Sequence, residues 1–423
     1  MIQENLLEYV ENSIKNNWNI SALSDYKGKP YSYSEVGELI TGLHLFFDEN
    51  GIQKGDKIAL ISNNSANWAV IFLAVVSYGG VIVPILSDFR PKDIHNIVTH
   101  SDAKLLFSSE SVWKTLNIKK MKGLKSAFSV EDFTSLTAGD IKNTSKELFK
   151  EKFPNGIKPE EINFQEMKKD DLAVISYTSG TTGFSKGVML SHNSLAANIR
   201  FAHRHMPLNP GDPILSLLTI AHVFGMVFDF LFPFTLGCHI TFLTKIPSLP
   251  VLTQAYAEIQ PRLILLVPLL MEKIYKNKLV PTIKKPIMKT LLKIPGLRQI
   301  IFKSINKKIS AVFGGQFREL ILGGAAFNQD AEKFFMQIKF PFTIGYGMTE
   351  CAPLISYAPW NAHRPESCGK TVDTLEVKID SDDPENIVGE IMVKGDNVMK
   401  GYYKNTEATE SVLNKDGWLR TGD

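Results

Sequence analysis

Apolar residues recur along the chain with two periods, one typical of helices and one typical of buried strands. Four apolar residues near the N-terminus have helical spacing and predict an amphipathic packing helix. Short apolar runs at residues 57–62, 80–84 and 103–107 predict strands, and helices are expected to begin near Ala66 and Pro91. Strands that alternate with helices at this interval indicate a parallel, doubly wound sheet.

The same alternation returns later in the chain. Further strands are predicted at residues 214–217, 239–243, 263–267 and 319–322. We therefore expect an α/β protein with two doubly wound lobes within residues 1–366, which can interleave in the sequence and divide near residues 185–215. The charged stretch 146–169 is interpreted as a solvated connection between the lobes.

The pattern changes from residue 367 onward. Residues 375–379 and 389–395 alternate apolar and polar side chains, as half-buried antiparallel strands do. Residues 367–423 are therefore expected to form a small β-rich, distorted barrel-like subdomain. The most apolar stretch, 68–86, is interrupted by serine, glycine and proline. It predicts a buried helix, a turn and a core strand, because a membrane span needs roughly 20 uninterrupted apolar residues.

Composition narrows the class of protein. With 423 residues, 44% hydrophobic and 22% charged, the chain is typical of soluble globular proteins. Its net charge of +3 is too small for this length to indicate nucleic-acid binding. The three cysteines lack metal-type spacing and the N-terminus lacks the features of a secretory signal. We expect a cytoplasmic protein.

A loop rich in glycine and hydroxyl residues follows the apolar run at residues 172–175. Its sequence, residues 177–188, is Tyr-Thr-Ser-Gly-Thr-Thr-Gly-Phe-Ser-Lys-Gly-Val. Backbone amides, hydroxyls and the Lys186 ammonium can together form a concave surface for a polyphosphate. The order differs from a Walker A loop, because Ser185 precedes the lysine and Gly187 follows it. Composition alone also allows a flexible polar surface loop.

Two further stretches carry candidate chemistry. Residues 344–350 place Tyr346, Thr349 and Glu350 close together among glycines. The ring can stack on a base, the hydroxyl can donate to a phosphate, and the carboxylate can hold Mg²⁺ together with substrate phosphates. Residues 322–326 follow a predicted strand, and their small side chains allow a flat ring to lie against the backbone, although many strand-to-helix turns use glycine. A lone histidine among apolar residues, such as His222, is more often a core residue than a catalyst.

Together these motifs resemble those of the adenylate-forming superfamily, which includes acyl-CoA synthetases, luciferases and the adenylation domains of peptide synthetases. The 177–188 loop is similar to the family's phosphate loop, and residues 344–350 are similar to its second hallmark motif. Residues 389–403 and 417–423 match later motifs, and Asp423 resembles the family's ribose-binding aspartate. The Ala-His-Val-Phe sequence at residues 221–224 is closest to the long-chain members. The resemblance covers most of the chain.

The resemblance implies an ATP- and Mg²⁺-dependent ligase that converts a carboxylic acid, expected to be a medium- or long-chain fatty acid, to an acyl-adenylate. CoA, or an acyl carrier protein, then displaces AMP. Implied catalytic residues are Thr178, Lys186, His222, Thr349 and Glu350, with Glu350 and Thr178 as metal ligands and His222 beside the acyl pocket. Implied nucleotide-binding residues are Thr178, Ser179, Gly180, Thr181, Thr182, Gly183, Lys186, Gly323, Gly324, Ala325, Gly345, Tyr346, Gly347, Met348, Thr349 and Asp423.

Family members continue beyond the position of Asp423 into a smaller domain that carries a lysine for adenylation. We therefore expect this chain to be the large N-terminal domain, which binds nucleotide but ligates poorly. Two alternatives stay open. One is an amino-acid- or aryl-acid-adenylating domain, for which Asp229 is the nearest candidate partner of an ammonium group. The other is a nucleotide-binding module without turnover.

One basic segment remains to be interpreted. Residues 273–318 contain no acidic residue and interleave lysines with apolar side chains. Such a segment can lie against an anionic membrane, here the inner face of the membrane, as a peripheral contact. A solvated helical hairpin and a surface that attracts the phosphates of CoA are the alternatives. The oligomeric state is left open.

Overall fold

The computed structural model describes residues 5–137, 144–178, 186–244 and 248–423. Its largest sheet has six strands in the order β6-β5-β3-β4-β7-β8. All neighbours are parallel except β7 and β8, which form an antiparallel pair. The strands predicted at residues 57–62, 80–84 and 103–107 are confirmed. In sequence order the six strands are β3 (Lys57–Ile61), β4 (Val81–Ile85), β5 (Ala103–Ser108), β6 (Ser126–Ser129), β7 (Leu172–Thr178) and β8 (Lys186–Ser191).

Helix α3 (Ala66–Ser77) is apolar on all sides and is buried on nearly all sides. Ser65 caps it by accepting a hydrogen bond from the Trp68 backbone amide at 3.1 Å. Every residue of the helix except Asn67 is buried, which confirms the buried helix, turn and strand expected at residues 68–86. Within the described parts of the chain, no helix combines the length and the apolar character needed to cross a bilayer.

A second group of strands forms two smaller sheets, in which all neighbours are parallel except β1 and β2. The first has the order β2-β1-β10-β9 and the second the order β11-β12-β13. Strand β1, from the N-terminal region, pairs in parallel with β10, so this sheet joins segments more than 200 residues apart. The lobe boundaries proposed from the sequence stay a prediction. The strands are β1 (Ser21–Asp25), β2 (Tyr31–Ser32), β9 (Pro213–Ser216), β10 (His239–Phe242), β11 (Leu263–Leu266), β12 (Glu319–Leu322) and β13 (Phe342–Ile344).

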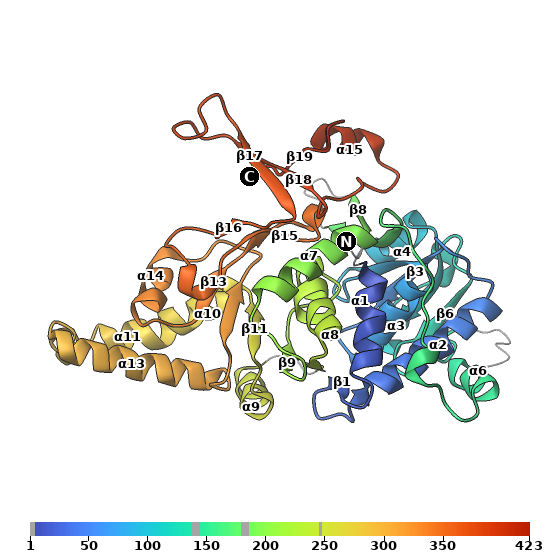
Figure 1. Ribbon diagram of the computed structural model, residues 1–423, viewed down its shortest axis with the longest axis horizontal. Coiled ribbons are helices and arrows are strands. Elements are labelled where there is room, and N and C mark those ends of the chain that lie inside the picture. Colours follow the sequence, from blue (N-terminus) through green and yellow to red (C-terminus); the bar gives the residue numbers. More distant parts are fainter. Residues whose placement is uncertain (1–4, 138–143, 179–185, 245–247) are drawn as a thin grey trace.

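Helices pack around these sheets (Figure 1). The predicted N-terminal helix is α1, in which Leu6, Leu7, Val10 and Ile14 are all buried. The bounds of these helices are α1 (Leu6–Asn16), α2 (Tyr33–Glu49), α4 (Pro91–His100), α6 (Ser145–Lys152), α7 (His192–His205), the π-helix η3 (Gly225–Leu231), α8 (Phe232–Leu236), α9 (Leu249–Ile259) and α14 (Gln329–Gln337).

The interpretation of residues 146–169 as a solvated connection between the lobes is wrong in one respect. Most of its residues are exposed, but the segment links β6 to β7 within one sheet and does not join two lobes. The segment contains helix α6 and buries Leu148, Ile157, Ile162 and Met167. Helix α6 approaches α2 closely, since a Cβ on Gly42 would lie 2.8 Å from the Ser145 carbonyl oxygen. Its many charged residues concealed the four apolar positions that hold the segment against the core.

The C-terminal strands form two open, antiparallel, three-stranded sheets, of which the alternating pattern predicted the β17–β18 pair. The expected barrel-like form is wrong, because neither sheet closes on itself. Figure 1 shows β17, β18 and β19 above the junction where β15 lies beside β8 and α7. The elements are β14 (Tyr346–Gly347), β15 (Leu354–Tyr357), β16 (Lys370–Thr371), β17 (Leu375–Asp380), β18 (Glu390–Gly395), α15 (Thr406–Val412) and β19 (Leu419–Arg420).

Candidate nucleotide and acyl site

Thr178 and Lys186 lie opposite each other at the loop end of the β7–β8 hairpin. The predicted phosphate-binding residues between them, Ser179, Gly180, Thr181, Thr182 and Gly183, lie outside the described residues. The composition of residues 177–188 favours one loop, whereas Lys186–Ser191 form strand β8. The reason is packing across the hairpin, because a Cβ on Gly187 would lie only 2.9 Å from Ile175 Cγ2.

Tyr402 joins the two charged residues of the predicted phosphate and metal site. The Lys186 ammonium lies over its ring, 4.8 Å from the centroid, and its hydroxyl donates to Glu350 Oε1 at 2.8 Å. The backbone around Tyr402 hydrogen-bonds to the outer edge of β8, which fixes the ring beside Lys186. Tyr402 is not among the site residues that the motifs predict. The signal that could have identified it is the aromatic pair that follows Gly401.

The residues around Glu350 fit a magnesium ion that arrives with a nucleotide. Glu350 is half-buried in the short 3₁₀ helix Thr349–Cys351, and Tyr402 holds one of its oxygens. The described residues contain no cluster of three histidine, cysteine or acidic side chains. Mg²⁺ is commonly bound by one or two carboxylates together with substrate phosphates. One positioned carboxylate therefore suits a nucleotide-delivered ion better than a permanently bound one.

Tyr346 and Asp423 meet at the predicted adenosine site. The Tyr346 hydroxyl donates to Asp423 Oδ2 at 2.5 Å, although the two residues are 77 positions apart. Burial raises the pKa of Tyr346, and the hydrogen bond to Asp423 raises it further. The hydroxyl therefore stays protonated and orients the carboxylate. One Asp423 oxygen is occupied by this bond, and the side chain is exposed to solvent.

The glycines after β12 have two different environments. The Phe224 ring lies against Gly323, where a Cβ would come within 2.9 Å of Phe224 Cζ. Gly324 has a positive φ of +83° and nothing within 4 Å of an added Cβ, and Ala325 is exposed. This turn therefore has room for a flat ring beside Gly324 and Ala325 but not beside Gly323. A protein side chain already covers Gly323, and Gly324 and Ala325 face open space.

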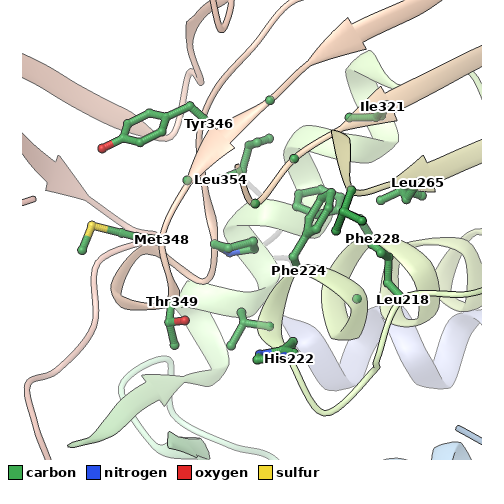
Figure 2. A pocket seen from close by; sticks show the side chains of 18 of the residues that line it. Leu218, His222, Phe224, Phe228, Leu265, Ile321, Tyr346, Met348, Thr349 and Leu354 are labelled. Carbon is green, nitrogen blue, oxygen red and sulfur yellow. The ribbon is translucent and has the colours of Figure 1, made fainter. Parts of the chain in front are cut away.

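A cavity of about 500 Å³ lies beside Phe224, Gly323, Gly324 and Tyr346. Figure 2 shows Tyr346 and Thr349 on one side of it and Phe228, Leu265 and Ile321 on the other. One end is thus polar and the other apolar. The predicted residues that line the cavity are His222, Gly323, Gly324, Gly345, Tyr346, Gly347, Met348 and Thr349. Lys186, Glu350, Thr178, Ala325 and Asp423 are not among the lining residues.

His222 lies on the cavity wall (Figure 2). Burial lowers its pKa, and the attraction of Asp88 opposes that shift only in part. The imidazole is therefore neutral near pH 7.

Asp229 does not line the cavity. It is buried in η3, and its Oδ2 accepts hydrogen bonds from the backbone amides of Leu217 at 2.9 Å and Leu218 at 3.1 Å. Burial raises its pKa to about 7. Its suggested role as the partner of a substrate ammonium group is wrong, because the carboxylate already holds the backbone that carries the cavity wall.

Known proteins share this sequence pattern and this fold. Residues 10–403 match the model of a family described as "AMP-binding enzyme". Long-chain-fatty-acid–CoA ligase 1 of Saccharomyces cerevisiae is 28% identical over 467 residues, which cover 98% of this chain and 65% of that protein. The chain thus spans about two thirds of that relative's length.

Two solved structures have the same fold. The inhibitor-bound N-terminal domain of FACL13 from Mycobacterium tuberculosis has a TM-score of 0.75 at 19% identity, covering 100% of this chain and 96% of its own. The anthranilate CoA ligase AuaEII in complex with anthranoyl-AMP has a TM-score of 0.77 at 17% identity, covering 99% of this chain and 74% of its own. With residues 10–403 matched, the chain belongs to the AMP-binding enzyme family.

Proposed function

We propose that the chain contains the nucleotide- and acyl-binding site of an ATP-dependent fatty acid–CoA ligase. The observation that carries this proposal is the arrangement of Lys186, Tyr402 and Glu350, where a cation, a ring and a carboxylate are in successive contact. Lys186 stands at the end of the hairpin that carries the proposed phosphate loop. Glu350 is next to Thr349, which lines the polar end of the cavity. Triphosphate, metal and carboxylate groups can therefore meet at one place.

The proposed reaction has two steps. A carboxylate oxygen attacks the α-phosphorus of ATP, the α–β phosphoanhydride bond breaks, and pyrophosphate leaves. The CoA thiol then attacks the acyl carbon, loses its proton and releases AMP; an acyl carrier protein is the alternative acceptor. Because both reactants of the first step are anions, positioning and fixed positive charge supply most of the catalysis. Lys186 and a magnesium ion held by Glu350 and Thr178 would supply that charge, with Thr349 donating to the α-phosphate.

The proposed acid is a medium- or long-chain fatty acid. Phe224, Phe228 and Leu265 make one end of the cavity apolar, and the yeast relative is named a long-chain-fatty-acid–CoA ligase. An aryl acid is the second candidate, because the neighbour that holds anthranoyl-AMP has the same fold. An amino acid fits less well, since the described lining of the cavity includes no acidic side chain.

Isothermal titration calorimetry with ATP and Mg²⁺ tests the nucleotide site. We expect binding that Lys186→Ala and Glu350→Ala each weaken at least tenfold. Lys119→Ala and Glu385→Ala are matched controls, because both side chains are exposed and lie outside the proposed site. Absence of binding, or equal binding by all four variants, contradicts the assignment.

A set of stable acyl-adenylate mimics tests the acid. Acyl-sulfamoyl adenosines with dodecanoyl, hexadecanoyl, benzoyl and aminoacyl groups differ only in the part that would enter the apolar end. We expect the fatty acyl mimics to bind at least tenfold more tightly than the benzoyl and aminoacyl ones. The reverse order would leave the nucleotide site intact and replace the fatty acid with an aryl or amino acid.

A further inference from the structure

Residues 274–317, here called the basic arm, form a helical excursion between β11 and β12. The arm starts at the end of α10 (Pro268–Ile274) and continues through η4 (Tyr275–Leu279), α11 (Val280–Ile283), α12 (Pro286–Leu291) and α13 (Pro295–Val312). Figure 1 shows α11 and α13 extending from the body of the molecule, far from the C-terminal strands. The arm lies outside the proposed site, because none of its residues lines that cavity.

Charge is concentrated in the basic arm. It contains ten lysine or arginine residues and no acidic residue, whereas the rest of the chain has 37 basic and 44 acidic residues. All ten basic side chains are exposed, and across the described residues none of the ten forms an ion pair within 4 Å. The arm is thus a cationic surface on an otherwise acidic protein. Such a surface attracts an extended anionic partner.

Large apolar side chains are exposed among these charges. Ile287 is 77% exposed and Ile300 is 66% exposed, with Ile294 and Leu297 also exposed. In α13 the inner face is defined by Phe302, Ile305, Ile309 and Val312, which pack against the core. Helical spacing then places Ile300, Lys303 and Lys307 on the opposite, outward face. The outward face therefore combines apolar residues with lysines.

A groove at the base of the arm has the same mixed character. This cavity of about 430 Å³ lies between α10–η4 and α13. Ile274, Leu279 and Ile309 contribute to its apolar lining, and Lys273, Lys278 and Lys308 also line it. An apolar floor edged by ammonium groups matches a molecule that has a hydrocarbon chain and an anionic head.

We propose that the basic arm is a docking surface for a bilayer that contains anionic phospholipids. Lysines on the outward face pair with lipid phosphates, and Ile287 and Ile300 enter the boundary between head groups and acyl chains, as in other interfacial helices. An acidic protein would also complement the positive charge of the arm. A bilayer additionally offers an apolar region that the exposed isoleucines can enter. Docking holds the protein beside a source of hydrocarbon chains.

Co-sedimentation of the 423-residue chain with vesicles tests this proposal. The probes are vesicles of phosphatidylcholine alone and vesicles with 30% phosphatidylglycerol, each in 50 and 300 mM salt. We expect binding to the anionic vesicles only, with at least a tenfold loss at the higher salt because screening weakens exposed charge interactions. CoA in excess is added to a parallel sample, and polyglutamate to another.

Two sets of variants assign the binding to the arm. Lys303→Glu/Lys307→Glu/Lys308→Glu is expected to reduce vesicle binding at least tenfold, and Ile287→Ser/Ile300→Ser at least threefold. The matched controls carry the same changes at exposed positions elsewhere, Lys119→Glu/Lys122→Glu/Lys125→Glu and Ile387→Ser/Val388→Ser, and are expected to bind as the parent does. Circular dichroism confirms that each variant is folded.

The proposal is overturned if the parent chain does not sediment with anionic vesicles, or if the arm and control variants lose binding equally. It is also overturned if CoA or polyglutamate releases the protein at equal charge concentration, which would assign the arm to a soluble anion or an acidic protein. ATP binding is measured in parallel, so that failure of the nucleotide site is distinguished from failure of the docking surface.

Discussion

Removing the Tyr402 hydroxyl tests whether this residue organises the nucleotide site. Tyr402→Phe keeps the ring that contacts Lys186 but removes the hydrogen bond to Glu350 Oε1. Hydrogen bonds to charged groups contribute about 1.5–3 kcal/mol. Glu350 is only half-buried, so water can replace part of this contribution, and we expect a loss of about 1–2 kcal/mol in ATP–Mg²⁺ binding. That loss corresponds to a dissociation constant raised roughly fivefold to thirtyfold.

Calorimetry with ATP and Mg²⁺ measures this effect. Tyr403→Phe is the matched control, because the Tyr403 hydroxyl also donates to a carboxylate, Asp102 Oδ2, at 2.7 Å but away from Glu350. We expect the control to bind ATP within twofold of the parent chain.

A double-mutant cycle shows whether Tyr402 acts through Glu350. If it does, Tyr402→Phe has little further effect in a Glu350→Gln background, with a coupling energy of about 1–2 kcal/mol. Additive effects, or a Tyr402→Phe dissociation constant within twofold of the parent value, would refute the reasoning. Tyr402 would then be a packing residue of the β8 edge.

Three other predictions follow from the geometry. Gly323→Val places new side-chain atoms against the Phe224 ring, which must move into the cavity. The affinity for an acyl-sulfamoyl adenosine, measured by calorimetry, should therefore fall at least tenfold. Unchanged affinity would show that the ring moves elsewhere. Asp423→Asn should reduce the preference for ATP over 2′,3′-dideoxy-ATP about tenfold, and an unaltered preference would exclude Asp423 as the ribose acceptor. For Asp229, burial raises the folded-state pKa to about 7 from an unfolded value of about 3.9, so the folded protein retains a proton that the unfolded chain releases. Its contribution to the free energy of unfolding therefore falls as pH rises from about 4 to 7, by an amount on the order of 4 kcal/mol. Urea unfolding at several pH values should show that Asp229→Asn lacks this decrease in the free energy of unfolding. The same pH dependence in both proteins would contradict the prediction.

Local pattern was sufficient for most strands and for the motifs. Parallel strands that are buried on both faces have short, continuous apolar sequences. The strands predicted at residues 57–62 and 319–322 agree with β3 and β12 to within one residue at each end. The charge pattern of residues 146–169 predicted a connection between lobes, but four buried apolar residues among the charges pack the segment against the core. Strand β8 was missed because its pairing with β7, and not its own composition, makes it a strand.

The relation between the motifs was decided only by tertiary structure. The sequence by itself determined the α/β class, the order of the motifs and the residue types available for phosphate, metal and base. It did not show that the Tyr402 ring lies between Lys186 and Glu350, that Phe224 covers Gly323, or that Asp229 serves the backbone. These contacts join residues up to 216 positions apart in the chain, as in the pair Lys186 and Tyr402. They depend on how sheets and helices pack, which the period of a local pattern does not encode.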